Sequence, residues 1–321
     1  MSNRSAVATN TMLPRTKAQK FWVAFKKNWQ MHLMIIFPLA YLILFSYVPM
    51  YGVQIAFKDY SPRAGIWDSA WVGLKHFTKF FDYYLWPNLV WNTLSLSFYS
   101  IFLGFPIPIV LALVIHVNTG KALKKLAQNV SYVPHFISLV VMVGILNTVL
   151  NPVSGFLGFI NKMTGNLAYN DIRASKESFR HLYVWSGIWQ GAGWSSIIYI
   201  SALSGVPDEL HEAAKLDGAS RLRRVWSVDI PTILPTVCLM LIMRFGSVMS
   251  VGYQKAYLMQ YDTNLEVSEI ISTYVYKQGI RKNNMSFGTA IGLLNSVINM
   301  VLVFLVNWVT NALSDGEMGL F

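Results

Sequence analysis

The sequence predicts an all-α integral membrane protein built around a bundle of six transmembrane helices. Of its 321 residues, 54% are hydrophobic and only 13% are charged, and the mean hydropathy is +0.41. Soluble domains carry about 25% charged residues. Crossing a bilayer takes roughly 20 apolar residues, and six stretches reach about that length: 33–51, 88–115, 133–150, 182–203, 233–252 and 287–309. Because all the Lys and Arg residues except Arg244 lie before or between these stretches, the net charge of +11 does not indicate nucleic-acid binding.

Residues 1–31 form the first predicted region, a basic cytoplasmic tail with an interfacial helix. Aromatic residues recur at helical spacing among lysines in the segment KAQKFWVAFKKNW, residues 17–29. This pattern favours a helix that lies on an anionic leaflet, and a disordered basic tail is the alternative. Residues 1–31 contain no acidic residue, so the positive-inside rule favours a cytoplasmic N-terminus. Six crossings then place the C-terminal tail, residues 312–321, on the same side.

Residues 32–311 are predicted to form the transmembrane domain. The first span carries no charge, and the second contains Pro106 and Pro108, which predict a kink or a local break. The fourth span, 182–203, is less apolar because Gly, Ser and Gln interrupt it. Small and polar residues of this kind favour packing inside a bundle, or lining a path, over facing lipid.

The loop 204–232 follows the fourth span and reads as two short helices joined by a turn. Pro207, Asp208 and Glu209 suit the first turn of a helix. Asp217 and Gly218 predict its end, because glycine adopts the left-handed conformation that turns the chain. The segment Ala219–Trp226 then resumes as a basic helix. On these rules alone, the loop is either a docking element with a thin alanine-rich profile or an ordinary solvated connector.

The residues of this loop carry a family resemblance. The stretch EAAKLDGASRLRRVWSVDIPTILP closely resembles the EAA loop of bacterial ABC-importer permeases, and stretches such as WVGLKHF and FGTAIGLLNSVINMVLVFLVNW resemble the polysaccharide-type branch of carbohydrate permeases. The resemblance implies the type I importer fold, in which this loop forms a coupling helix that seats in a cleft of a cytoplasmic ATPase. Carried over by position, the transmission site is Glu212, Ala213, Ala214, Asp217, Gly218 and Ala219.

The resemblance also implies an assembly in a bacterial inner membrane. Its members would be a second permease, expected to be a different chain, two ATP-binding cassette subunits that hold ATP and Mg²⁺, and a periplasmic binding protein that delivers sugar. This chain has no P-loop of its own: the only Gly-Lys pair is Gly120-Lys121, which Ala122 follows, and Ile115 stands where the first glycine is needed. The alternative is an ion-coupled secondary sugar carrier, which normally has inverted repeats and acidic residues within its spans. The six predicted spans contain neither Asp nor Glu.

Four residues are candidates for the substrate path. Arg244 lies about halfway through the fifth predicted span, where a charge costs about 2.5–3.5 kcal/mol and should face water or a partner. Its guanidinium would bind a carboxylate, which favours an acidic, alginate-like oligosaccharide. An ion pair or carbonyl contact with the second permease is the alternative. The other three are Trp189, Gln190 and Trp194, which are typical of side chains that line a path for sugar. The tryptophans equally suit a belt at the membrane interface.

No other chemistry is predicted. The six histidines show no metal-ligand spacing along the chain, so the sequence predicts no metal site. There is no HExxH, no Gly-x-Ser-x-Gly and a single cysteine, Cys238. The chain is therefore expected to be a transporter subunit without a bound cofactor, rather than an enzyme.

Overall fold

A computed structural model of the chain describes residues 22, 25–118, 120–164 and 171–313. The chain divides into two compact units, residues 1–54 and 55–321. Most of the predicted N-terminal interfacial segment, together with residues 1–16 and most of the C-terminal tail, lies outside the described residues, so the boundaries of both tails stay predictions.

The first unit is a single helical run that confirms a helix over the predicted span 33–51. It consists of α2 (Trp29–Leu42), a π-helical turn (Ile43–Tyr47), α3 (Val48–Met50) and a 3-10 segment (Tyr51–Phe57) that continues into the second unit. No residue of α2 is buried. Because its apolar side chains point outward on all sides, lipid or partner subunits are expected to surround this helix.

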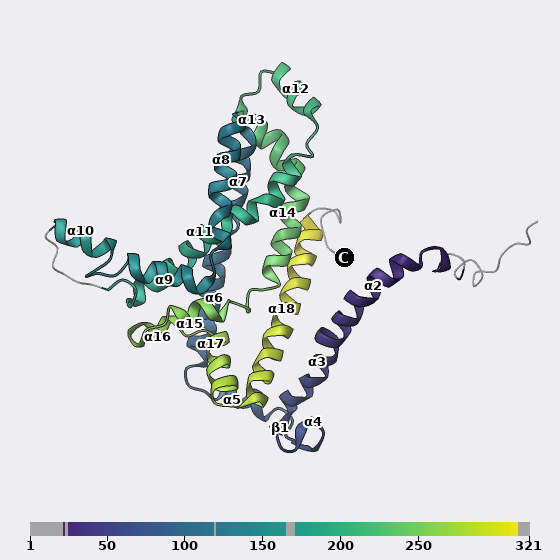
Figure 1. The fold of residues 1–321 in the computed structure, drawn as a ribbon, viewed down its shortest axis with the longest axis vertical. Coiled ribbons are helices and arrows are strands. Elements are labelled where there is room, and N and C mark those ends of the chain that lie inside the picture. The colour runs from purple at the N-terminus through teal and green to yellow at the C-terminus, as the bar shows by residue number, and fades with distance from the viewer. Residues whose placement is uncertain (1–21, 23–24, 119, 165–170, 314–321) are drawn as a thin grey trace, which may run out of the picture. The chain divides into compact units, whose positions relative to one another are not determined.

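The second unit opens with a small hairpin and continues as helices (Figure 1). Strands β1 (Lys58–Ser61) and β2 (Ser69–Trp71) pair antiparallel with Lys58 opposite Trp71, and α4 (Gly65–Asp68) joins them. The helices that follow are α5 (Lys75–Phe81), α6 (Trp86–Gly104), α7 (Pro106–Val117), α8 (Lys121–Tyr132), α9 (Leu139–Val149), α10 (Phe156–Thr164), α11 (Lys176–Leu203), α12 (Asp208–Leu216), α13 (Arg221–Arg224), α14 (Ile230–Phe245), α15 (Tyr253–Leu258), α16 (Leu265–Ser268), α17 (Ile271–Val275) and α18 (Met285–Leu313).

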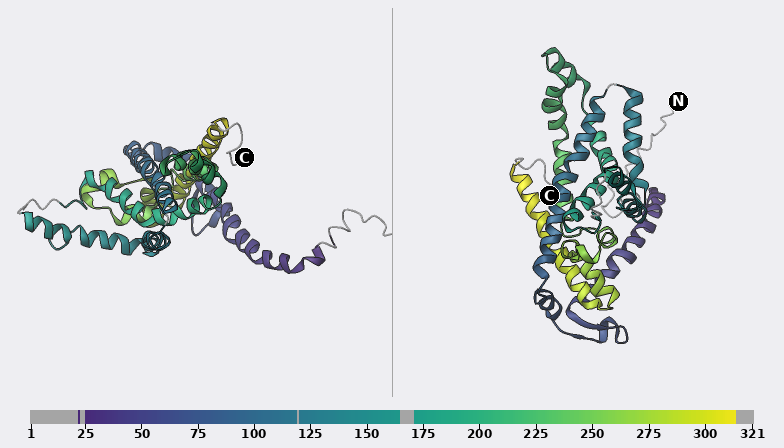
Figure 2. Two further views of the ribbon diagram at one scale, coloured as in Figure 1. Left: turned by 90° about the horizontal axis from the view of Figure 1, so that it is seen from above. Right: turned by 90° about the vertical axis from the view of Figure 1, so that its left-hand side faces the viewer.

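Helix α11 is the centre of the second unit. One buried cluster joins it to α6, α9 and α15, and another joins it to α7 and α14. Its small residues permit close packing: a Cβ on Gly193 would lie 2.0 Å from the carbonyl oxygen of Ser131 in α8. The predicted packing of this less apolar segment inside a bundle is therefore confirmed. Figure 1 and the right-hand view of Figure 2 show α12 and α13 at one end of the unit, with α5 and the hairpin at the other.

The expected count of six spans is supported only in part. Among the described residues, four helices are long and apolar enough to cross a membrane: Trp29–Phe57, Trp86–Val117, Arg221–Phe245 and Met285–Ala312. A bent pair, Lys121–Phe136 with Leu139–Val149, would make a fifth. The second span contains the predicted break, because α6 ends at Gly104 and α7 begins at Pro106. Helix α11 contains the predicted span 182–203 but is not among the four, so a sixth crossing stays a prediction.

Two predicted spans have the wrong course. The segment 133–150 is not one helix, because the chain bends by 99° between Phe136 and Leu139. Ile137 is extended there, and the Ser138 hydroxyl caps the new helix by accepting from the Val141 amide at 3.3 Å.

The segment 233–252 is not helical to its end either, because α14 stops at Phe245 and Gly246 follows it. Arg244 therefore lies in the last turn of its helix rather than halfway along it.

Candidate functional site

A cavity of about 510 Å³ lies in the second unit and contains the candidate path residues Arg244 and Gln190. Helices α6, α7, α11 and α14 form its walls, together with the segment that follows α14. Polar groups along the wall include the hydroxyls of Ser97, Ser100, Ser195, Ser247 and Ser250. Its volume falls within the range of small-molecule sites, about 300–1,000 Å³.

Two basic side chains line this cavity. Arg244 is exposed at the end of α14, whereas Lys255 in α15 is only 7% exposed. The Lys255 ammonium donates a hydrogen bond to the Tyr183 carbonyl oxygen at 2.6 Å and lies 4.5 Å from the centre of the Tyr183 ring. Within the described part of the chain, neither cation forms an ion pair, and no acidic residue lines the cavity. Burial lowers the pKa of Lys255 to about 7, so Arg244 is the fixed positive charge of the cavity, and this charge suits an anionic ligand.

The other candidate path residues divide between the cavity and the outer face of α11. Gln190 lines the cavity, and its side-chain amide donates to the Ile137 carbonyl oxygen at 2.7 Å. Trp189 and Trp194 do not line it and are about half exposed. Trp194 instead stacks on His135, with ring centroids 4.5 Å apart and planes 4° from parallel. The sequence pattern did not show which of these residues face the cavity and which face outward, because all three lie within two turns of one helix.

Lys255 is the cavity residue that the sequence did not reveal. It lies in the segment between the fifth and sixth predicted spans, which was expected to be an external loop. In the structure, α15 packs on α9 and returns Lys255 to the wall of the cavity. Residues near Lys255 in the chain, in the stretch GYQKAYL, give no signal of this return, because it depends on contacts with Tyr183, more than 70 residues earlier.

The loop 204–232 forms the predicted short helix and turn, but its second helix does not end as a short one: α13 continues through a π-helical turn, Val225–Asp229, into α14. Helix α12 begins at Asp208, just after Pro207, and carries Glu209 in its first turn. Gly218 has φ +74°, the left-handed conformation that favours glycine. The amide of Ala219 then donates to the Ala214 carbonyl oxygen at 2.9 Å, which closes the turn. The hydroxyl of Ser220 accepts from the Arg223 amide at 3.3 Å and caps α13.

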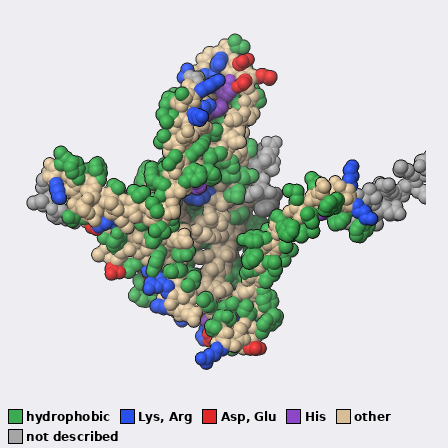
Figure 3. All heavy atoms as spheres, in the orientation of Figure 1, with side chains coloured by type: hydrophobic (Ala, Val, Ile, Leu, Met, Phe, Trp, Pro, Cys, Tyr) green, Lys and Arg blue, Asp and Glu red, His purple; other side chains and the backbone are tan. Residues whose placement is uncertain are grey.

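The surface of this loop exposes both charged and apolar side chains. Glu212, Ala213, Asp217 and Gly218 are exposed, and Ala214 and Ala219 are half-buried. Figure 3 shows acidic and basic side chains gathered over α12 and α13. Large apolar side chains are also exposed there: Leu216 at 90%, Leu222 at 75% and Trp226 at 72%. Exposed apolar groups ringed by charges are typical of a surface that another protein covers.

Comparison with known proteins decides the family. The sequence model of the family described as "Binding-protein-dependent transport system inner membrane component" matches residues 85–315. The chain belongs to this family. The match includes the cavity and the loop 204–232, and it confirms the resemblance inferred from the EAA stretch. The chain is thus a multi-pass membrane component of a transport system, and its apolar helices agree with that assignment.

Similar proteins cover nearly the whole chain. The Bacillus subtilis (strain 168) polygalacturonan/rhamnogalacturonan transport system permease protein YteP is 38% identical over 309 residues, 96% of this chain and 95% of that protein. Protein LplB of the same organism is 36% identical over 312 residues, 97% of this chain and 96% of that protein.

Two solved structures have the same fold. A chain from a bacterial ABC transporter involved in the import of the acidic polysaccharide alginate has a TM-score of 0.82 and 33% identity, and the match covers 91% of this chain and 99% of that one. A chain from a bacterial alginate ABC transporter in complex with alginate pentasaccharide-bound periplasmic protein has a TM-score of 0.83 and 32% identity, covering 93% and 99%.

Proposed function

We propose that this chain is the permease subunit of an ATP-driven importer of acidic oligosaccharides. The observation that carries the proposal is the Arg244 guanidinium, which forms no ion pair within the described residues, in a cavity without lining carboxylates. The relatives support the substrate class: one is named for polygalacturonan and rhamnogalacturonan, and two similar structures belong to alginate transporters. All three names denote polysaccharides that contain uronic acids.

The cavity supplies groups for both parts of a uronate sugar. The Arg244 guanidinium is planar and donates two parallel hydrogen bonds to one carboxylate. Lys255 adds a second basic group to the wall, and the hydroxyls of Ser100 and Ser195 would exchange hydrogen bonds with sugar hydroxyls. Trp189 and Trp194 have no role here, since they lie outside the cavity. Only one side of the path belongs to this chain, because a second permease, expected to be a different chain, completes it.

Energy would enter through the loop 204–232. In this proposal α12 is the coupling helix, which seats in a cleft of a cytoplasmic ATP-binding subunit. Glu212 offers a charge to that subunit, Ala213 and Ala214 keep the profile thin, and Asp217, Gly218 and Ala219 set the turn. The exposed Leu216, Leu222 and Trp226 supply apolar contact area. Two such ATPase subunits would bind ATP and Mg²⁺, and their closure would move the membrane helices.

The assembly would work in the bacterial inner membrane with both termini of this chain in the cytoplasm. A periplasmic binding protein would deliver the sugar to the outer face; one of the similar structures is a complex with an alginate pentasaccharide-bound periplasmic protein. Nothing in the sequence or the fold favours the ion-coupled carrier, and the family assignment speaks against it.

The test is ATPase stimulation in the native assembly. The complex is purified through a tag on this chain and reconstituted with its binding protein, and hydrolysis is measured with uronate oligosaccharides and with neutral ones of equal length. The proposal predicts that an ATPase copurifies and that uronates stimulate it selectively. Equal stimulation by neutral sugars would reject the acidic substrate class. Absence of a copurifying ATPase would reject the coupling role of the loop.

A further inference from the structure

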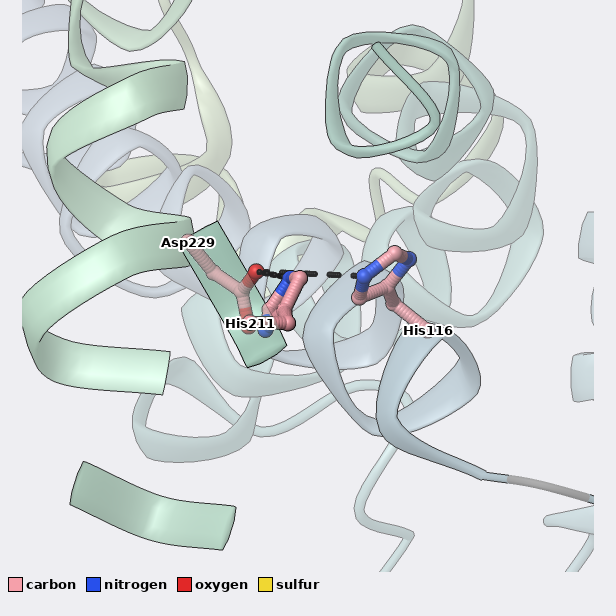
Figure 4. A group of neighbouring side chains, drawn as sticks. All are labelled: His116, His211 and Asp229. Carbon is pink, nitrogen blue, oxygen red and sulfur yellow. Dashed lines mark ion pairs between the residues drawn. The ribbon is translucent and has the colours of Figure 1, made fainter. Parts of the chain in front are cut away.

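Three side chains that lie far apart in the sequence meet at the base of the loop 204–232. His116 lies in the last turn of α7, His211 lies in α12, and Asp229 precedes α14. One donor atom from each side chain lies within 4.8 Å of the other two. In Figure 4 both imidazole rings turn toward the same carboxylate oxygen of Asp229.

Asp229 is a buried carboxylate with little to neutralise it. Its side chain is 2% exposed, and in the described residues its only ion-pair partners are the two histidines. The Asp229 Oδ1 and the His211 Nε2 are 3.1 Å apart, yet both are buried atoms without a hydrogen-bond partner. The ring nitrogen is therefore close to the oxygen but not aligned for a hydrogen bond with it. Burying a carboxylate oxygen without a hydrogen bond is costly, so this position favours a cation.

The spacing of the donor atoms suits a zinc-type ion. Zn²⁺ holds imidazole nitrogen and carboxylate oxygen at about 2.0–2.2 Å, so two tetrahedral ligands lie roughly 3.3–3.6 Å apart. The Asp229 oxygen lies 3.1 Å from His211 Nε2, slightly less than this ligand separation, and 3.8 Å from His116 Nε2, slightly more. The two histidine side chains are 19% and 23% exposed, which leaves solvent access for a water as fourth ligand.

We propose that His116, His211 and Asp229 form a binding site for a divalent transition-metal ion of the zinc type. Sequence spacing did not reveal it, because its ligands come from three separate helical segments. A bound ion would tie α12 to α7 and to the start of α14. If α12 is the coupling helix, as proposed above, bound metal would hold it against the membrane helices and slow the transport cycle. Metal binding itself is measurable without transport.

The experiment compares metal binding by matched variants of the purified full assembly. After removal of bound metals by a chelator, Zn²⁺ is titrated against a chromophoric competitor for wild type, His211→Ala and His135→Ala. His135 is an exposed histidine outside the cluster and serves as the control. We expect wild type and His135→Ala to bind one more Zn²⁺ per copy of this chain than His211→Ala. Asp229→Asn should weaken the site at least tenfold.

A second readout uses Co²⁺ in place of Zn²⁺. A four-coordinate cobalt site gives a visible absorption band that should be present in wild type and absent in His211→Ala. Gel filtration of each variant with its partner subunits checks that the assembly is intact. Equal Zn²⁺ stoichiometry in wild type and His211→Ala would overturn the proposal and leave the cluster as an imidazole–carboxylate contact.

Discussion

The Lys255 ammonium lies 4.5 Å from the centre of the Tyr183 ring and donates a 2.6 Å hydrogen bond to the Tyr183 carbonyl oxygen. These contacts offset part of the cost of burying the charge. An ammonium has three donors, and this carbonyl takes one, so the others remain for the cavity that Lys255 lines. Tyr183 thus holds Lys255 at the wall of the cavity that Arg244 also lines.

The first prediction concerns Gly187, which leaves room for the Lys255 ammonium. A Cβ at position 187 would lie 3.0 Å from the Lys255 nitrogen, so Gly187→Ala should displace it. We expect the uronate concentration for half-maximal ATPase stimulation to rise roughly three- to tenfold, about 0.7–1.4 kcal/mol.

Gly191→Ala is the matched control for this change. Gly191 lies one turn further along α11 and also lines the cavity, but a Cβ there meets nothing within 4 Å. It should shift the half-maximal concentration less than twofold. Equal effects of the two substitutions would mean that the position of Lys255 does not matter for substrate recognition.

The second prediction concerns the contact between α11 and α8. A Cβ on Gly193 would lie 2.0 Å from the Ser131 carbonyl oxygen, which is backbone and cannot rotate away. Gly193→Ala should therefore force the helices apart and destabilise the fold by about 1–3 kcal/mol. Thermal unfolding in detergent measures this as a lower Tm. Gly144→Ala in α9, where a Cβ meets nothing within 4 Å, should not lower it, and similar Tm values for both variants would refute this packing.

The third prediction concerns the turn after α12. Gly218 has φ +74°, and the left-handed region costs other residues about 1–2 kcal/mol. Asparagine tolerates this region better than alanine. We expect the amount of ATPase that copurifies with the tagged chain to fall in the order wild type, Gly218→Asn, Gly218→Ala. If the two variants retain equal ATPase, the conformation of this turn does not govern docking.

The sequence predicted the helices well where composition alone determines them. Long apolar runs gave the helices at Trp29–Phe57, Trp86–Val117 and Met285–Ala312, and the Pro106 break and the Gly218 turn follow from local backbone chemistry. The predictions that were wrong concern features that depend on packing against residues distant in the chain. The 99° bend before Leu139 and the early end of α14 lie within apolar runs that look continuous.

In the candidate sites, too, the sequence revealed residues that stand out locally and missed residues that only the fold brings together. Arg244 stood out because a charge in an apolar run is rare, and it does line the cavity. Lys255 did not stand out, because its segment looks like an ordinary polar loop. The cluster of His116, His211 and Asp229 was missed for a related reason: metal-ligand spacing within one segment is visible in a sequence, whereas ligands gathered from three segments are visible only in the fold.

The fourth prediction concerns pH and the segment before α11. Two hydrogen bonds from the Arg173 guanidinium, at 2.7 and 2.5 Å, hold the pKa of the Asp171 carboxyl below its usual value of 3.8. Arg173 also donates to the Asn147 carbonyl oxygen at 2.9 Å, which ties this segment to α9. A lowered pKa stabilises the fold at pH values above the unfolded pKa, and this contribution is lost as the pH falls through the folded pKa.

Asp171→Asn should therefore have a lower Tm than wild type at pH 7, and the difference should shrink once the pH falls below 3.8. Asp82→Asn is the control, since Asp82 is exposed and forms no ion pair within the described residues. A Tm difference for Asp171→Asn that is the same at all pH values would contradict this account.

The most direct test of the central claim, that Arg244 in the cavity selects an acidic sugar, is uptake by the reconstituted assembly. Uptake of a uronate oligosaccharide and of a neutral one of equal length is compared for wild type, Arg244→Gln and Arg63→Gln, the last being an exposed arginine in the hairpin connection. The account predicts at least a tenfold loss of uronate uptake in Arg244→Gln, with neutral uptake and Arg63→Gln unchanged. Unaltered uronate uptake by Arg244→Gln would contradict it and assign Arg244 to a contact with the second permease.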